Sequence, residues 1–386
     1  MSDIQEALTK LMGEKVKSFS KPQLLLAITV ASIFTHFIIT CAVLLGVTIY
    51  ALANSNIRKM MFHAKGLIWL GLFSILIIVV PSLYGRWVSA LIGIAVIIVI
   101  LFYLFAQSII TDELYHYTID IACFMSLICF IVALGQKLFY GFSFRSTAGL
   151  LNANYYGTII EFVVLLCVYR IIIGTKMPNA YIGVILINIL GLFLCDCQSS
   201  WLSIIAGVFI LICFNKYKKY ALLFLAIASI FVCIGIFVPG ILPRWDRMPQ
   251  TFSTRMNIWR TAIQGIKAHP LFGQGTLTYM FINKLYKGYD TYHAHSLYLD
   301  PLLSYGIVGV GLLITYLCNY FKALSYQVNK IRSLVFAFVA AVCVHGITDI
   351  SILWVQTGLL LLFIASGCFI EKKNNKDEII VDMKPN

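Results

Sequence analysis

The sequence predicts an all-α protein that crosses a membrane many times. Of its 386 residues, 60% are hydrophobic and only 12% are charged, a composition far from that of soluble domains. The apolar residues form runs of about 20, the length that a helix needs to cross a bilayer. Lysine and arginine gather between the runs, so we assign the net charge of +13 first to membrane topology. The lipid bilayer, and no nucleic acid, is the expected partner.

Ten apolar runs follow a longer first one. As a single helix the first run, 22–53, would be about 48 Å long at roughly 1.5 Å per residue, which exceeds a bilayer. We therefore expect two short helices there, with a turn near 35–40, and about twelve spans in one domain, 22–370, between cytoplasmic tails at 1–21 and 371–386. The ten later helices are expected at 66–84, 87–110, 117–135, 153–174, 180–196, 198–214, 220–238, 296–320, 333–348 and 352–370.

Basic clusters set the orientation, because lysine and arginine accumulate in cytoplasmic loops. The clusters alternate correctly through the ten helices, with both chain ends inside, and they comprise Arg58, Lys59, Lys65, Arg170, Lys176, Lys216, Lys218, Lys219, Lys322, Lys330, Arg332, Lys372 and Lys373. Asp112 and Glu113 then fall in an inner loop, where acidic residues carry little weight. A long polar loop, about 239–295, lies outside.

This outer loop is basic, against the expected topology. Its seven cations face only two acids, and the cations are Arg244, Arg247, Arg255, Arg260, Lys267, Lys284 and Lys287. An anionic ligand at the outer surface would explain them, since arginine donates two parallel hydrogen bonds to phosphate oxygens. The alternative is that long loops are translocated whatever their charge.

A surface helix is predicted within the loop, capped by Ser253 or Thr254 and ended by Pro270. Its apolar face comprises Ile258, Trp259, Ala262, Ile263 and Ile266, and its polar face comprises Arg260, Gln264 and Lys267. Arg255 lies one turn before Trp259 and shares the apolar edge. It is either an anion ligand or a snorkelling interfacial arginine.

Two histidines, His293 and His295, follow the surface helix. A metal site needs three or four ligands, and no histidine-rich or cysteine-rich partner segment stands in the outer loops, so no metal or other cofactor is expected. A neutral imidazole can take a proton from a hydroxyl nucleophile, which makes a general base the better-motivated role. A structural histidine at the membrane interface is the alternative.

Four segments together resemble a known family. They are "RSTAGLLNANYYG" (145–157), "RMNIWRTAIQGIKAHPLFGQG" (255–275), "HAHSLYLDPLLSYGIVG" (293–309) and "HGITD" (345–349). Arginine, tryptophan, a His-Pro-Leu-x-Gly-x-Gly turn and a histidine before a helix with Tyr-Gly-Ile are similar to the signature of the O-antigen ligase and O-antigen polymerase superfamily.

The resemblance implies a metal-independent, inverting glycosyltransferase of GT-C architecture in the bacterial cytoplasmic membrane. Such enzymes move a glycan from a polyprenyl diphosphate to an acceptor sugar hydroxyl at the extracytoplasmic face. Carried over by position, His295 is the catalytic base and Arg255 the catalytic cation at the diphosphate. The remaining substrate contacts are expected from Arg145, Asn154, Ser199, Ser200, Arg244, Trp259, Arg260, His293, Ser296 and Asp349.

Two positions depart from the family pattern. Where the family often has Ser-Arg-Gly, this chain reads "CDCQSSWLS" and lacks the arginine, so we expect Arg145 to replace it, with Arg86 and Arg244 as further candidates. The family's His-Asn pair reads His295 followed by Ser296. We favour a surface-polysaccharide polymerase. The alternatives are a ligase that uses a distinct acceptor, such as a lipid A core or cell-wall sugar, and a flippase for the lipid-linked glycan, for which Glu161, Asp120 and His36 are the ionisable candidates within spans.

Overall fold

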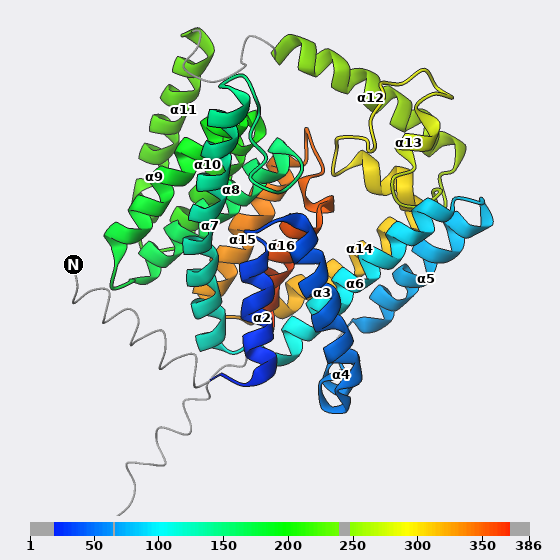
Figure 1. The fold of residues 1–386 in the computed structure, drawn as a ribbon, viewed down its shortest axis with the longest axis horizontal. Coiled ribbons are helices and arrows are strands. Elements are labelled where there is room, and N and C mark those ends of the chain that lie inside the picture. Colours follow the sequence, from blue (N-terminus) through cyan, green and yellow to red (C-terminus); the bar gives the residue numbers. More distant parts are fainter. Residues whose placement is uncertain (1–18, 65, 239–247, 371–386) are drawn as a thin grey trace, which may run out of the picture.

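The computed structural model describes residues 19–64, 66–238 and 248–370, and throughout these residues the regular structure is helical (Figure 1). The α-helices are α2 Lys21–Ser32, α3 Phe37–Ala53, α4 Ser55–Phe62, α5 Leu67–Leu83, α6 Trp87–Ile109, α7 Asp112–Tyr140, α8 Ala153–Ile173, α9 Pro178–Cys195, α10 Gln198–Cys213, α11 Ala221–Phe237, α12 Met248–Ala268, α13 Tyr279–Ile282, α14 Leu299–Ser325, α15 Asn329–His345 and α16 Val355–Ser366. Short 3₁₀ turns lie at Lys218–Tyr220, Ser351–Leu353 and Gly367–Phe369.

The first apolar run is two helices, as the sequence predicts. α2 and α3 are separated at residues 33–36. The backbone groups freed by this break are satisfied from α16, because the side-chain amide of Gln356 donates to the carbonyls of Ile33 at 2.7 Å and Thr35 at 3.1 Å. A buried polar side chain far along the chain therefore stabilises the turn between two short apolar helices.

All ten later helices are present, and two local expectations need correction. Asp112 and Glu113 do not form a loop but open α7, where Thr111 caps the helix by accepting from the Leu114 amide. Acidic residues suit this position because the helix dipole is positive at its N-terminus. A short helix, α4, also follows α3, with Asn54 as its capping residue.

Six helices of the described residues are long and apolar enough to cross a membrane, or seven if the bent pair α3 and α4 counts as one span. The six are the stretches Trp87–Ile109, Asp112–Tyr140, Ala153–Ile173, Pro178–Cys195, Lys218–Gly235 and Leu299–Ser325. Shorter apolar helices occur at Leu67–Leu83, Gln198–Cys213 and Val355–Phe369. The chain is thus a multi-pass membrane protein, while the number of twelve spans stays a prediction.

α8 is the most buried of the candidate spans. It packs against α7, α9, α10 and α15, and α10 pairs closely with α15. α14 packs instead against α5 and α12, and α5 against α6. In Figure 1, α12 lies along one edge of the view, roughly across the other helices. The sequence predicted this surface helix, but not its start: it already includes Met248, and Thr254, expected as a cap, donates back to the Gln250 carbonyl inside the helix.

The His-Pro-Leu-x-Gly-x-Gly turn after α12 docks into a break in α14. Gly306 has φ 62° and ψ −172° inside the helix, so the amides after it are free of helical partners. The amides of Ile307 and Val308 donate to the carbonyls of Pro270 and Leu271, each at 2.9 Å. A β-carbon on Gly306 would collide with the Leu271 backbone. The break therefore fixes the end of α12 against the first turns of α14.

Candidate active site

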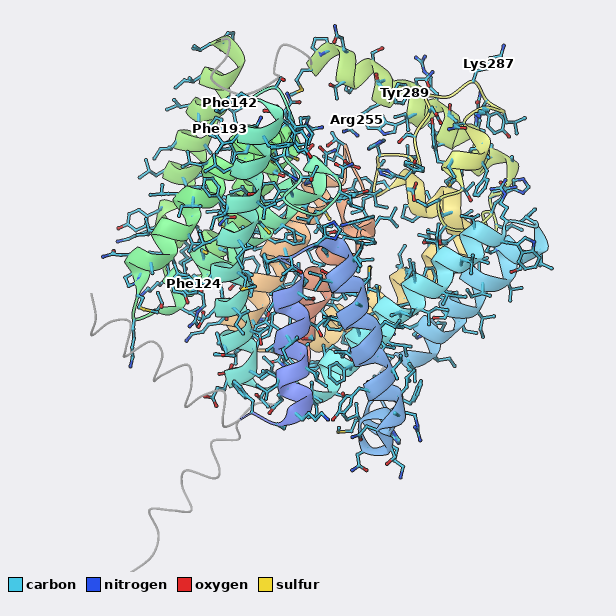
Figure 2. The ribbon with its side chains drawn as sticks, viewed as in Figure 1. Phe124, Phe142, Phe193, Arg255, Lys287 and Tyr289 are labelled. Atoms are coloured by element: carbon cyan, nitrogen blue, oxygen red, sulfur yellow. The ribbon has the colours of Figure 1, made fainter. Side chains whose placement is uncertain are left out.

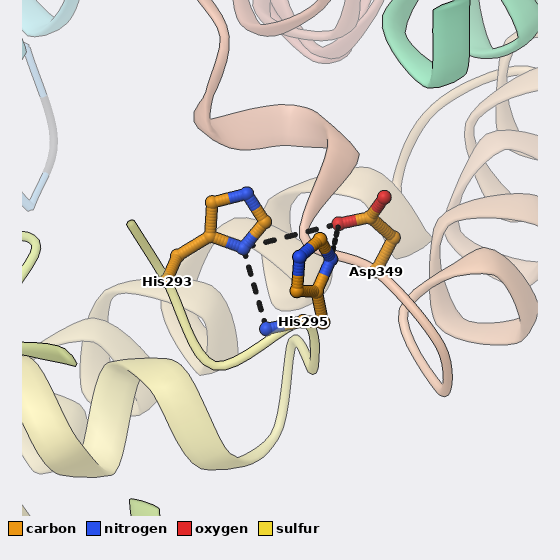
Figure 3. Close-up of side chains that lie close together, drawn as sticks. All are labelled: His293, His295 and Asp349. Atoms are coloured by element: carbon orange, nitrogen blue, oxygen red, sulfur yellow. Dashed lines mark hydrogen bonds and ion pairs between the residues drawn. The ribbon is translucent and has the colours of Figure 1, made fainter. Parts of the chain in front are cut away.

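Two histidines and a distant carboxylate meet at the start of α14 (Figure 3). The Nδ1 atom of His295 lies 2.9 Å from Oδ1 of Asp349, and Nδ1 of His293 lies 3.9 Å from the same oxygen. Asp349 stands in the turn after α15. The fold thus brings the histidine segment and the "HGITD" segment together, as their joint assignment to one site requires.

The backbone around His295 is held from several sides. His295 has φ 45°, a left-handed conformation that is uncommon for a residue with a side chain. Its carbonyl accepts from the indole Nε1 of Trp259 at 3.4 Å. Ser296 follows, and its hydroxyl oxygen accepts from the amides of Tyr298 and Leu299 at the entry to α14. The surrounding structure therefore imposes the conformation that aims the imidazole at Asp349.

Asp349 is a buried carboxylate supplied with donors. Oδ1 accepts from His295 and from the Ile350 amide at 2.8 Å, and Oδ2 accepts from Nδ2 of Asn154 at 2.7 Å. Burial by itself raises the pKa of Asp349, but the hydrogen bond from His295 and the charges of His295, His293 and Arg255 hold it well below its usual range. An ionised carboxylate only accepts, so Nδ1 of His295 carries the proton and Nε2 is the basic nitrogen.

Arg145 contacts Asn154, the residue that donates to Asp349. Its guanidinium donates to Oδ1 of Asn154 at 2.7 Å and to the carbonyls of Cys195 and Asp196 at 3.1 and 3.3 Å. These bonds fix the orientation of the Asn154 amide toward Asp349. Arg145 lies at the site, as expected, but much of its donor capacity is used by the protein.

Arg255 differs from Arg145 in its hydrogen bonding. Its Nη1 atom is buried and makes no hydrogen bond within the described part of the chain. Burial lowers the pKa of Arg255, the Asp349 carboxylate raises it, and Arg145 lowers it further. An arginine remains charged at neutral pH even so. Figure 2 places Arg255 on the side of α12 that faces the other helices, where a buried cationic donor lacks an acceptor.

Of four other residues expected at the site, three lie in the described part of the chain. Ser199 reaches the site's edge, with its hydroxyl 2.7 Å from that of Thr348. Ser200 is buried and donates to the Cys197 sulfur instead. Arg260 is exposed on α12, on a different face from Arg255. Arg244 lies outside the described residues.

His293, His295 and Asp349 could by distance hold a metal ion, since their ligand atoms lie within 4.8 Å of one another. Asp349 was not considered as the third ligand because it lies 54 residues after His295 in the sequence. The donor set does not fit a divalent cation, however. Both Asp349 oxygens already accept protein hydrogen bonds, Nδ1 of His293 accepts from the His295 amide, and two arginines stand nearby.

A second imidazole–carboxylate pair lies beside the first. Nδ1 of His345, the last residue of α15, is 2.9 Å from Oε2 of Glu161 on α8, and both side chains are fully buried. The sequence marks Glu161 as an ionisable residue within a span, but not its partner. The amides of Thr348 and Asp349 bond to the His345 carbonyl, so the pair ties the Asp349 turn to α8.

Residues 183–314 match the family model described as O-Antigen ligase. The resemblance to the O-antigen ligase and polymerase superfamily is confirmed. The matched segment runs from α9 into α14 and contains Arg255, His293 and His295 of the O-antigen ligase signature, whereas Arg145, Asn154 and Asp349 lie outside it. No curated protein matches the chain. The match over residues 183–314 supports an enzymatic function of the O-antigen ligase and polymerase type in this multi-pass membrane protein.

Proposed function

We propose that the protein transfers a glycan from a polyprenyl diphosphate to an acceptor sugar hydroxyl at the extracytoplasmic face, as a surface-polysaccharide polymerase. One observation carries the proposal: Arg255 has a buried guanidinium nitrogen that makes no hydrogen bond to the described residues, and it shares a site with a carboxylate-bound imidazole. The first group suits an anionic leaving group, and the second suits a hydroxyl nucleophile.

The reaction needs one displacement. The acceptor hydroxyl gives its proton to Nε2 of His295 while its oxygen bonds to the anomeric carbon. The bond from that carbon to the diphosphate oxygen breaks, and the electron pair leaves with the diphosphate, whose growing charge Arg255 stabilises. Asp349 stabilises the resulting imidazolium, which then loses its proton to water. A single displacement inverts the anomeric centre, and no step requires a metal ion.

The test is reconstitution of the purified protein in lipid with one defined lipid-linked repeat unit. A ladder of products without a second acceptor is expected for a polymerase, whereas a product that requires a distinct acceptor would identify a ligase. Movement of the lipid across the vesicle without any change in the glycan would overturn the proposal in favour of a flippase.

The role of Arg255 has a matched control on the same helix. Arg255→Ala should lower turnover by about 10²- to 10³-fold, the usual loss for one preorganised donor. Arg260→Ala removes an equal charge from an exposed position and should change turnover by less than about threefold. Equal turnover of the two variants would reduce Arg255 to an interfacial anchor.

A further inference from the structure

One nitrogen of His295 is left for the acceptor, and a protein hydroxyl already lies against it. Nδ1 is engaged with Asp349, while Nε2 lies 3.2 Å from Oγ1 of Thr291. Because Nδ1 carries the proton, Nε2 accepts and the threonine hydroxyl donates. Thr291 thus makes the hydrogen bond that an acceptor sugar hydroxyl must make before it reacts.

The position of Thr291 is built into the loop before it. The amide of Tyr289 donates to Oδ1 of Asn257 on α12 at 2.7 Å, and the Tyr289 carbonyl accepts from the buried Tyr279 hydroxyl at 3.2 Å. Asp290 accepts from the side-chain amide of the buried Asn283 at 2.9 Å. With both preceding residues anchored, the backbone presents Thr291 to the imidazole.

We propose that the Thr291 hydroxyl holds the place of the acceptor hydroxyl at Nε2 of His295 until an acceptor glycan displaces it. This inference rests on the proposed function. Rotation of the threonine about χ1 moves the hydroxyl away without moving the anchored backbone. While the hydroxyl is in place, the base has no free lone pair to activate water, so the glycan donor is protected from hydrolysis.

The same loop offers the surface over which a saccharide would reach the base. Tyr289 and Tyr292, on either side of Thr291, are 55% and 68% exposed, and the exposed Lys287 precedes them. Figure 2 shows Lys287 projecting away from the helices. Exposed tyrosines present an apolar ring face together with a polar hydroxyl, which suits the mixed surface of a sugar. The acceptor end of the site therefore lies on the 287–292 loop.

Three substitutions separate the functions of the threonine. Thr291→Val keeps the shape without the hydrogen bond and should lower the acceptor KM by about fivefold, the effect of one hydrogen bond that need not be broken. Thr291→Ala also opens space for water and should raise donor hydrolysis in the absence of acceptor by about tenfold. Thr291→Ser should behave like the wild type. Thr315→Val on α14, where the wild-type hydroxyl donates to the Gly311 carbonyl of the same helix, is the matched control.

Several results would overturn the inference. One is a Thr291→Val enzyme with unchanged acceptor KM and a Thr291→Ala enzyme with unchanged hydrolysis, in a wild type that transfers glycan normally; the proposed function would survive this outcome. Another is a glycan found covalently on Thr291 by mass spectrometry, since the threonine would then be a nucleophile. A wild type that transfers no glycan would instead overturn the proposed function, and this inference with it.

The loop surface has its own control. Tyr292→Ala should raise the acceptor KM by about fivefold and leave the donor KM unchanged. Tyr140→Ala removes a tyrosine that is 61% exposed at the end of α7, and it should change neither constant. Equal effects of the two substitutions would contradict an acceptor surface on this loop.

Discussion

The molecule holds two histidine–carboxylate pairs of the same length, His295–Asp349 and His345–Glu161, each at 2.9 Å. They differ in access. The side chain of His295 is 21% exposed and its second nitrogen meets Thr291, whereas His345 and Glu161 are 0% exposed and each keeps one atom without a hydrogen bond in the described residues. Only the first pair can exchange a proton with a substrate.

The two pairs also differ in what surrounds the carboxylate. Asp349 accepts from His295, the Ile350 amide and Asn154, and it stands near Arg255. Glu161 has His345 as its charged partner, inside a span. The comparison shows that two histidine–carboxylate pairs of the same length can differ in whether the second imidazole nitrogen is accessible and whether an arginine lies nearby, which are the two features that the proposed function requires. A sealed pair of the same geometry links helices.

The largest effect should come from removing the two imidazoles in turn. His295→Gln should lower kcat by about 10³-fold at unchanged stability, since a general base contributes about 10²- to 10⁴-fold. His345→Gln should lower the thermal stability, while its folded fraction keeps kcat within about tenfold. Glycan-transfer kinetics and thermal unfolding in detergent check both. The comparison fails if the His345 variant is stable and equally inactive.

The next largest effect is the loss of stability when the buried His345–Glu161 pair loses one of its two members. Glu161→Ala leaves His345 buried without its partner and should lower the free energy of unfolding by about 3 kcal/mol. Replacing both residues by leucine should recover most of that loss, because no buried polar group is then left unpaired. Thermal unfolding of the single and double variants measures this. A double variant as unstable as the single one would contradict a mainly structural pair.

A smaller effect concerns His293, which lies beside the His295–Asp349 pair. Burial lowers the pKa of His293 to about 4, with His295 and Arg255 adding to the shift against Asp349. Between about 6.5 and about 4 the unfolded chain therefore binds a proton that the folded protein does not, so stability falls as the pH falls. From about pH 7 to about pH 5 the loss should be about 2 kcal/mol.

His293→Gln should remove this part of the pH dependence while activity near neutral pH is kept. Unfolding of both proteins at the two pH values gives the difference. Parallel pH dependence of wild type and variant would mean that the pKa of His293 is the same in the folded and unfolded states, against the shift expected from its burial.

The smallest expected effect is that of a chelator. Because the donors of Asp349 are protein groups and two arginines stand close by, removing divalent cations with EDTA should leave turnover within about twofold of the untreated enzyme. Turnover that is lost with EDTA and restored by one divalent cation would instead identify His293, His295 and Asp349 as metal ligands. The His295–Asp349 pair would then differ from the His345–Glu161 pair by a bound metal.

Much of the fold could be predicted because each helix depends on the hydropathy of its own consecutive residues. The ten later helices and the split first run follow from apolar run length, and the surface helix from its 3.6-residue pattern. The start of this helix could not be predicted, because serine and threonine occur both as capping residues and inside helices, and the sequence at Ser253 and Thr254 does not distinguish the two. The acidic start of α7 was misassigned, since a helix N-terminus and a polar loop have the same composition.

The site could be predicted in part, through the order of its segments. His295, Arg255, Asn154 and Asp349 do meet, and Arg145 is with them. The sequence assigned Arg145 and Asn154 to the substrate, which stays a prediction. In the structure Asn154 donates to Asp349, and Arg145 donates to Asn154. Thr291 stands in the histidine segment itself, but nothing in that segment indicates that its hydroxyl faces Nε2.

By itself the sequence determined a helical membrane protein with an arginine and a histidine in one polar loop, because hydropathy and periodicity act over neighbouring residues. Only the tertiary structure decided which groups share a proton or lack a partner. Asp349 meets His295 across 54 residues, and Glu161 meets His345 across 184. The positive φ at His295 belongs to the first of these contacts. Neither contact can be read from neighbouring residues, since a hydrogen bond depends on positions within a fraction of an ångström that packing fixes.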